Sequence, residues 1–490
     1  MAHIDVRTDR PIGTVDRRIF GSFTEHLGRC IYGGLLDEGS SRSDPRGFRT
    51  DVLGAVRDLG VTNVRWPGGN FVSGYHWTDG VGPAGDRPRR PELAWGAEEP
   101  NRFGTDEFMA WAQAAGVDPV ICLNMGTGTL DEAMAWVEYC NGTGDTYWAN
   151  RRRANGHPEP YRVRYWGLGN EMYGDWQLGQ RTAADYVATA RQWAKALKLL
   201  DPGICLVSCG QTGVDDWDQV VIDGLAACVG FHSIHLYTGS ADYWSNVLAP
   251  HFTERALSVT GTLIDRARYQ QRIEHEIGVA YDEWNVWYRT SDGQLAEVYN
   301  LADALAVGTY LNVFVRQSKI VRMANLAQLV NVIAPVVTGP DGMFRQPIYH
   351  PFALMANASH EVALDTFTDS GTHAHADLPG ERWTHRVADL GPFQLLDVAA
   401  TRDPAAQRLT ISVVNRDPER ELATRIRLQG AEATGTMTVH EVNGDKPDTE
   451  NSFEHPDNVA VRRSQRDVGG GDIDITFAPH SFTLLEVTLA

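Results

Sequence analysis

Short apolar runs alternate with longer amphipathic segments through the first three-quarters of the chain, and this alternation constrains the fold more than any other feature. Parallel strands need long crossover connections, usually helices, so the pattern predicts a parallel sheet. The strand-like runs lie near residues 19–24, 62–65, 119–123, 164–168, 206–208, 231–235, 279–282 and 321–324. Eight such strand–helix units predict a (β/α)8 TIM barrel over residues 14–360.

A doubly wound open sheet is the alternative architecture that shares this alternation. No G-x-G-x-x-G follows any of the strand-like runs, and the glycines at 68–69 and 126–128 lack that spacing. The barrel is therefore the favoured fold.

Helical periodicity is clearest at residues 182–200. The apolar residues Tyr186, Ala190, Trp193 and Leu197 recur there at spacings of three and four, and the sequence at 201–203, Asp-Pro-Gly, ends the run. A second helix of this kind is predicted over residues 105–115.

The hydrophobic period changes from about 3.6 to 2 beyond residue 360. Leu409, Ile411 and Val413, for example, alternate with polar residues, and turn-forming clusters separate the runs. This pattern predicts an antiparallel β-sandwich of the jelly-roll type over residues 361–490. Residues 1–13 contain one short run that can pair into either domain. The polar, glycine-rich segment 446–472 is expected to be a long loop.

The charge balance excludes some classes of partner. The chain holds 44 Lys and Arg against 63 Asp and Glu, a formal net charge of −19. Nucleic acids and anionic membranes attract clustered basic residues, so neither is an expected partner. The first residues lack the basic and apolar regions of a signal peptide, and the six cysteines form no C-x-x-C pair. Reduced thiols and a cytoplasmic location are expected.

Tryptophan is concentrated in the predicted barrel. Thirteen of the fourteen tryptophans lie between Trp66 and Trp287. A larger core accounts for some of them, but flat rings with a polar edge also suit the face of a sugar. The imbalance therefore points to an aromatic binding cleft in the front domain.

Two strand ends carry glutamates that suit hydrolytic chemistry. Glu171 follows the fourth run, after Asn170, and Glu283 ends the seventh. Reactive groups of a TIM barrel gather at these ends, and retaining glycosidases need a carboxyl pair about 5–5.5 Å apart. A single glutamate at a strand end is more often a surface residue or a helix cap, so the inference rests on the pair. His235, at the end of the sixth run, is expected to form hydrogen bonds within the site.

Five strings sharpen this interpretation. They are GSFTEHLGRCIYGGL (21–35), VRWPGGNFVSGYHWTDGVGP (64–83), YWGLGNEMYGDWQLG (165–179), YDEWNVWY (281–288) and MANLAQLVNVIAPV (323–336). In order and across residues 3–360, they resemble the α-L-arabinofuranosidases of glycoside hydrolase family 51. A C-terminal sandwich is also what that family carries.

The resemblance implies a role for each matching residue. Glu171 would be the general acid/base and Glu283 the nucleophile of a retaining, exo-acting α-L-arabinofuranosidase. The substrate-binding residues that it implies are Glu25, Asn70 and Asn170 on the furanose hydroxyls, Tyr237 and Gln328 beside the nucleophile, and Trp95 and Trp287 as aromatic walls. Terminal arabinofuranosyl residues of arabinan, arabinoxylan or arabino-oligosaccharides would be the substrates, and the assembly a homo-hexamer.

Two other functions share part of this pattern. Another retaining barrel glycosidase, such as an endo-β-glucanase or a β-xylosidase, carries the same glutamate pair. A sugar-binding protein that has lost catalysis is the more remote alternative. Neither HExxH nor a Walker A string occurs, so no metal and no other cofactor is expected.

Overall fold

Eight parallel strands close into a barrel and confirm the predicted (β/α)8 fold. The computed structural model describes residues 1–291, 294–379, 385–403 and 407–490. The barrel strands are β2 (Gly21–Phe23), β3 (Asn63–Trp66), β6 (Asp118–Cys122), β7 (Tyr165–Leu168), β8 (Cys205–Ser208), β9 (Phe231–Thr238), β10 (Gly278–Val286) and β11 (Val321–Ala327). Around the ring they follow chain order, and β11 closes it against β2.

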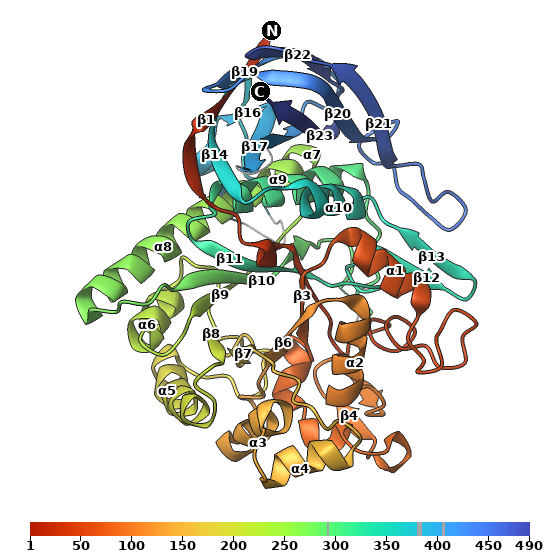
Figure 1. The fold of residues 1–490 in the computed structure, drawn as a ribbon, viewed down its shortest axis with the longest axis vertical. Helices are drawn as coiled ribbons and strands as arrows, with labels where there is room; N and C mark the ends of the chain where they lie inside the picture. The colour runs from red at the N-terminus through yellow and green to blue at the C-terminus, as the bar shows by residue number, and fades with distance from the viewer. Residues whose placement is uncertain (292–293, 380–384, 404–406) are drawn as a thin grey trace.

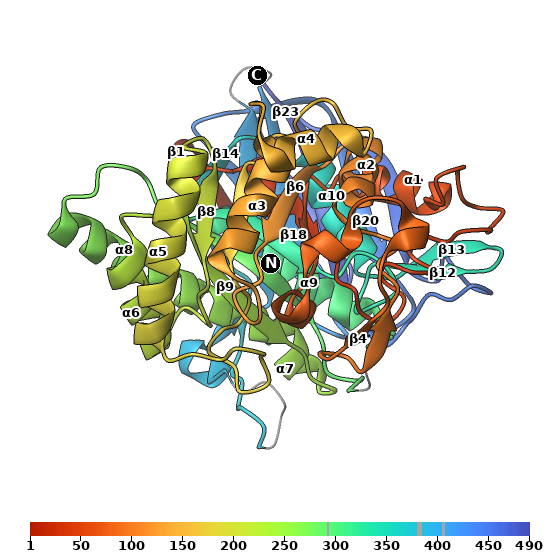
Figure 2. The same ribbon diagram turned by 90° about the horizontal axis from the view of Figure 1, so that it is seen from below.

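Helices cover the outside of these strands (Figures 1 and 2). They are α1 (Thr50–Leu59), α2 (Thr105–Ala115), α3 (Leu130–Asn141), α4 (Tyr147–Ala154), α5 (Ala183–Leu200), α6 (Asp216–Leu225), α7 (Tyr243–Leu248), α8 (Phe252–Gln271), α9 (Leu301–Arg316) and α10 (Tyr349–Ala358). The two helices predicted from periodicity are confirmed as α2 and α5. Thr182 caps α5 by accepting a hydrogen bond from the backbone N–H of Asp185, which satisfies a free donor of its first turn.

Nine strands form a second sheet, which lies above the barrel in Figure 1 and carries both chain ends. They are β1 (Ala2–Thr14), β14 (Val362–Asp369), β17 (Leu396–Asp403), β18 (Arg408–Asn415), β19 (Leu422–Gln429), β20 (Ala433–Asn443), β21 (Ala460–Asp467), β22 (Asp472–Phe477) and β23 (Ser481–Leu489). All neighbours are antiparallel except β1 and β19. Phe477 of the edge strand β22 and Met437 of β20, which lies next to the opposite edge, belong to one apolar core. The sheet therefore curls over on itself and forms the predicted sandwich.

Two details of this sheet differ from or extend the sequence interpretation. The N-terminal run lies in the second sheet, where β1 pairs with β14 and β19. The prediction of a loop over residues 446–472 is wrong for Ala460–Asp467, which form strand β21. Most of its side chains are exposed, as charged edge strands commonly are, and so it shows no apolar alternation. The domain boundary between residues 360 and 361 stays a prediction.

Helices α9 and α10 lie between the barrel and the second sheet (Figure 1). Almost all of α9 is buried, and at its end the Arg316 guanidinium contacts Glu254 of α8 at 2.6 Å and Asp397 of β17 at 3.1 Å. The two parts are therefore joined by a partly buried charge network as well as by apolar contacts. Within the described residues, the helices are all too short or too polar to cross a membrane.

Candidate active site

A cavity of about 640 Å³ opens at the carboxyl ends of the barrel strands. Every site residue predicted above lines it except Asn170, which lies beneath its wall. The predicted residues in the lining are Glu25, Asn70, Trp95, Glu171, His235, Tyr237, Glu283, Trp287 and Gln328. The barrel therefore gathers the predicted residues from six of its strand ends into one pocket.

Two carboxyl groups face each other in this cavity. One oxygen each of Glu171 and Glu283, together with a ring nitrogen of His235, lie within 4.8 Å of one another. Glu171 follows β7 with a left-handed φ of 43°, which turns the chain sharply at the end of the strand. Glu283 lies inside β10, where the register against β9 shifts between Ala280 and Glu283. That irregularity lets consecutive side chains, Asp282 and Glu283, both contact His235.

Glu283 is held by two donors. The guanidinium of Arg65 lies 2.6 Å from its Oε1, and the Tyr237 hydroxyl donates to its Oε2 at 2.9 Å. Burial raises the pKa of Glu283, the positive charges of His235 and Arg65 oppose this, and the nearby charge of Glu171 adds to it. The two glutamates therefore do not ionise independently. Arg65 was missed in the sequence, although a charged residue inside an apolar strand is a signal of such a role.

Glu171 accepts hydrogen bonds from three side chains. Tyr173 and Trp176 donate to it at 3.1 Å each, and Nδ1 of His235 lies 3.1 Å from its Oε1. Burial alone would raise the pKa of Glu171, but these hydrogen bonds outweigh it and the pKa lies below its usual value. Tyr173 and Trp176 lie in the string that contains Glu171, but no local pattern distinguishes them from its other aromatic residues.

Glu25 forms the floor of the cavity on the β2 side. Its carboxyl group accepts from the backbone N–H of Phe71 at 2.9 Å, from Nε1 of Trp95 at 3.0 Å and from Nε2 of Gln328 at 3.1 Å. Burial raises the pKa of Glu25 to about 8, and the charge of Glu283 adds to the shift. A Cβ at position 68 would lie 2.8 Å from Cγ of Glu25, so only glycine fits there.

Asn170 and Trp287 are fixed by their neighbours. The Oδ1 of Asn170 accepts from Arg65 at 2.7 Å, whereas its buried Nδ2 has no protein partner among the described residues. A buried donor without a partner is rare in proteins and marks a position where a water or ligand oxygen can accept. Nε1 of Trp287 donates to the carbonyl of Thr290 at 2.8 Å, and its ring meets the Tyr237 ring edge-on, with centroids 5.4 Å apart.

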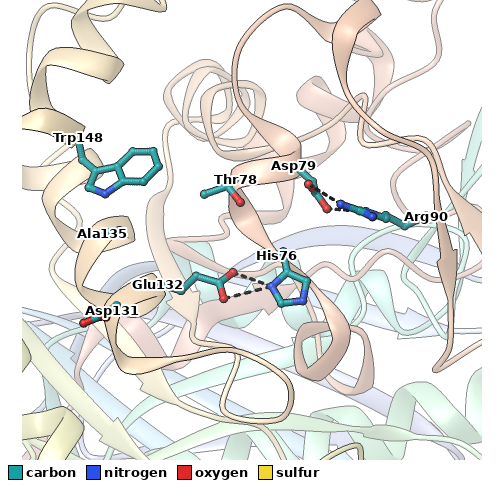
Figure 3. Close-up of a pocket in the computed structure, with 8 residues that line it drawn as sticks. All are labelled: His76, Thr78, Asp79, Arg90, Asp131, Glu132, Ala135 and Trp148. Carbon is teal, nitrogen blue, oxygen red and sulfur yellow. Dashed lines mark hydrogen bonds and ion pairs between the residues drawn. The ribbon is translucent and has the colours of Figure 1, made fainter.

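The hairpin of β4 (Arg90–Glu92) and β5 (Ala97–Glu99) carries Trp95 into the cavity. At its tip, the carboxylate of Glu92 accepts from the backbone N–H groups of Ala94 and Trp95 at 2.7 Å each. At its base, Arg90 forms an ion pair with Asp79 at 2.9 Å, beside a shallow hollow of about 420 Å³ (Figure 3). The position of Trp95 is thus set by contacts at both ends of the hairpin.

Glu171, His235 and Glu283 are the single group of three metal-ligating side chains found in the described part of the chain. Carboxylate oxygens and an imidazole nitrogen suit a divalent transition metal. Nδ1 of His235, however, is already engaged with Glu171. The geometry more directly serves proton transfer between neighbouring groups, as in carboxyl-pair hydrolysis of glycosides.

A parallel barrel with two carboxyl groups facing across a sugar-sized pocket defines the class of barrel glycoside hydrolases. Comparisons with known proteins narrow this class. The family model of the α-L-arabinofuranosidase 1 domain matches residues 55–249, and that of the α-L-arabinofuranosidase C-terminal domain matches residues 282–481.

Whole proteins match over nearly the entire chain. α-L-Arabinofuranosidase C of Emericella nidulans is 44% identical over 98% of this chain and 96% of its own. A Bacillus subtilis enzyme named intracellular exo-α-(1→5)-L-arabinofuranosidase 1 is 36% identical over 88% of each chain. The arabinose complex of the Thermotoga maritima α-L-arabinofuranosidase is 42% identical, with a TM-score of 0.91 over 99% of this chain and 100% of that one. The chain therefore belongs to the α-L-arabinofuranosidases of glycoside hydrolase family 51.

Proposed function

We propose that the protein releases terminal non-reducing α-L-arabinofuranosyl residues by double displacement, with retention of configuration. The observation that supports this most directly is the separation of the Glu171 and Glu283 oxygens, within 4.8 Å, which leaves no room for a water between carboxyl and sugar. Retaining glycosidases hold their carboxyl groups about 5–5.5 Å apart, whereas inverting enzymes hold theirs about 6.5–9.5 Å apart.

In the first step, Glu283 attacks the anomeric carbon while Glu171 protonates the departing glycosidic oxygen. A covalent glycosyl–enzyme forms, and the aglycone leaves. In the second step, Glu171 takes a proton from a water molecule, whose oxygen displaces Glu283 from the same carbon. Arg65 and Tyr237 both stabilise Glu283 as a carboxylate, which is the form that attacks and the form that is released.

Other contacts support recognition of one furanose ring. The Nδ2 of Asn170, which has no protein partner among the described residues, is the proposed donor to a sugar hydroxyl near the nucleophile, and Glu25 lines the cavity that would hold this sugar. Trp95 and Trp287 bound the space between them. A pocket of this size and closure fits exo-action on arabinan, arabinoxylan or arabino-oligosaccharides rather than binding of a continuous backbone.

The assignment of the two glutamates can be tested with substrates that differ in leaving group. Glu171→Ala should keep appreciable activity on 4-nitrophenyl arabinofuranoside, because 4-nitrophenolate leaves without protonation, and should lose activity on arabinobiose. NMR of the first product should show the retained anomer. Equal loss on both substrates, or an inverted first product, would contradict this mechanism.

Assembly and location complete the proposal. The homo-hexamer rests on family resemblance, and size-exclusion chromatography with light scattering tests it directly. The cytoplasmic location is supported by six cysteines that form no disulfide and by the name of the Bacillus subtilis relative. Fractionation of source cells, with activity measured in cytosol and medium, tests it.

A further inference from the structure

The imidazole of His235 lies between two carboxyl groups. Its Nδ1 is 3.1 Å from Oε1 of Glu171, and its Nε2 is 3.2 Å from Oδ1 of Asp282. The side chain is 4% exposed, so both carboxyl groups are its direct partners in a largely buried setting. Ionised carboxylates only accept hydrogen bonds. Each of the two contacts, Nδ1 with Glu171 and Nε2 with Asp282, must therefore contain one proton.

The proton facing Asp282 stays on the imidazole. Asp282 is paired with Arg65 at 3.3 Å and accepts from the hydroxyl of Ser233. Burial alone would raise the pKa of Asp282, but Arg65 and His235 hold it below its usual value. Asp282 is thus a fixed carboxylate that keeps Nε2 of His235 protonated, as carboxylates beside functional histidines do.

The other proton lies between Nδ1 of His235 and Oε1 of Glu171. This pair has two protonation states that contain the same number of protons. In one, an imidazolium faces a carboxylate. In the other, a neutral imidazole faces a carboxylic acid, which is the form that Glu171 needs as general acid. A single transfer across one hydrogen bond converts the first arrangement into the second.

We propose that Glu171 and His235 share one proton, that Asp282 retains it at this pair, and that His235 returns it to Glu171 when a glycoside is cleaved. The inference rests on the function proposed above and deepens it. His235 acts through Glu171 and is a positioning residue in this sense.

The proton balance closes over one catalytic cycle. The N–H bond at Nδ1 breaks as the O–H bond on Glu171 forms; that O–H bond then breaks as the leaving oxygen takes the proton with the electron pair of its bond to the sugar. Glu283 gains the bond to the anomeric carbon. In the second half, water gives a proton to Glu171 and its oxygen to the sugar, Glu283 leaves as carboxylate, and the proton returns to Nδ1.

Nucleophilic attack itself favours the transfer. The charged groups that face His235 are Glu171, Asp282 and Glu283, with Arg65 behind the last two. Burial would lower the pKa of His235, but the charge of Glu283 and the charge and hydrogen bond of Asp282, together with the hydrogen bond to Glu171, raise it to about 10. When Glu283 bonds to the sugar, its charge disappears 3.6 Å from Nδ1. The imidazolium is then destabilised at the moment when Glu171 gives up its proton.

Two variants test the proposal, and the chain offers a matched control. Asp282→Asn keeps a hydrogen-bond acceptor but removes the charge; His235→Gln keeps an amide donor but cannot supply a proton. His232→Gln is the control, because His232 lies on the same strand and contacts Asp218 and Ser208 instead of the catalytic glutamates. The pH dependence of kcat/KM is measured for each protein on methyl and on 4-nitrophenyl arabinofuranoside.

We expect the alkaline limb with the methyl glycoside to move at least about one pH unit lower in Asp282→Asn. His235→Gln should lose at least about tenfold more activity on the methyl glycoside than on the aryl glycoside, since the aryl leaving group needs no acid. The control should change neither the limb nor the substrate ratio. The proposal of a shared proton is overturned if the alkaline limb does not move and both substrates lose activity equally. This holds for variants that unfold at the wild-type temperature. Failure of the Glu171→Ala or product-anomer experiments would instead overturn the proposed function.

Discussion

The guanidinium of Arg65 lies 2.6 Å from Oε1 of Glu283 and, through its other terminal nitrogen, 2.7 Å from Oδ1 of Asn170. One buried cation from β3 therefore sets both the carboxylate of Glu283, the proposed nucleophile, and the direction of the Asn170 amide. The contact spans the barrel interior between residues 218 positions apart in the chain. Removing one member of a buried ion pair is strongly destabilising, because the other charge is then left without compensation.

Replacement of Arg65 is expected to disable the site. Arg65→Gln should lower kcat/KM on 4-nitrophenyl arabinofuranoside by at least about a hundredfold, because Glu283 loses its cation and Asn170 its anchor. Arg65→Lys restores the charge but cannot contact both partners, so it should recover only part of the loss. Steady-state kinetics with a thermal unfolding check measures this, and wild-type activity in Arg65→Gln would refute it.

Loss of the Tyr237 hydroxyl should affect turnover more than folding. A hydrogen bond to a charged group is worth about 1.5–3 kcal/mol, so Tyr237→Phe should lower kcat by about 10- to 150-fold. The ring contact with Trp287 is kept in this variant, and its melting temperature should stay near that of the wild type. A change in KM alone would show that the hydroxyl serves ground-state binding instead.

The raised pKa of Glu25 predicts a pH dependence of sugar binding. Its carboxyl group is neutral below pH of about 8 and negatively charged above it, where it repels Glu283 and no longer donates to a hydroxyl. The affinity for arabinose should therefore fall by about tenfold between pH 7 and 9. Calorimetric titration measures it, and Glu25→Gln, which cannot ionise, should bind more weakly but with little change over this range. An equal dependence in both proteins would assign the effect to another group.

The ion network at the junction predicts sensitivity to acid. Burial would raise the pKa values of Asp397 and Glu254, but Arg316 outweighs it and both lie below their usual values. Their stabilising contribution is therefore present above pH of about 4 and is lost as the pH falls further. Arg316→Met leaves Glu254 and Asp397 with only His251 and Asn312 as partners within the described residues and should lower the free energy of unfolding by about 1.5–3 kcal/mol at pH 7.

Denaturant unfolding at pH 7 and at about pH 2 measures this effect. The matched control is Arg425→Met, which breaks an exposed pair with Asp474 on β19 and β22 and should change the stability little. If the two variants unfold at the same denaturant concentration, the junction network does not stabilise the protein.

Features that depend only on neighbouring residues could be predicted from the amino-acid sequence. Helix α2 begins and ends where periodicity placed it, and α5 begins one residue later, because caps and apolar stripes act over one or two turns. The strand–helix alternation and the later change of period identified both sheets. Glu171 and Glu283 were found because a strand end followed by a glutamate is a local pattern.

The pairing of the polar residues in the site could not be predicted in this way, because it depends on how the strands pack. Simple alternation along a strand would send Asp282 and Glu283 to opposite faces, and a register shift in β10 brings both to His235. The contact of Arg65 with Glu283 exists because the barrel closes. Periodicity along the chain shows which face of its own helix or strand a residue occupies. The partners of Arg65, His235 and Glu283 are set instead by packing between strands that come together only on folding.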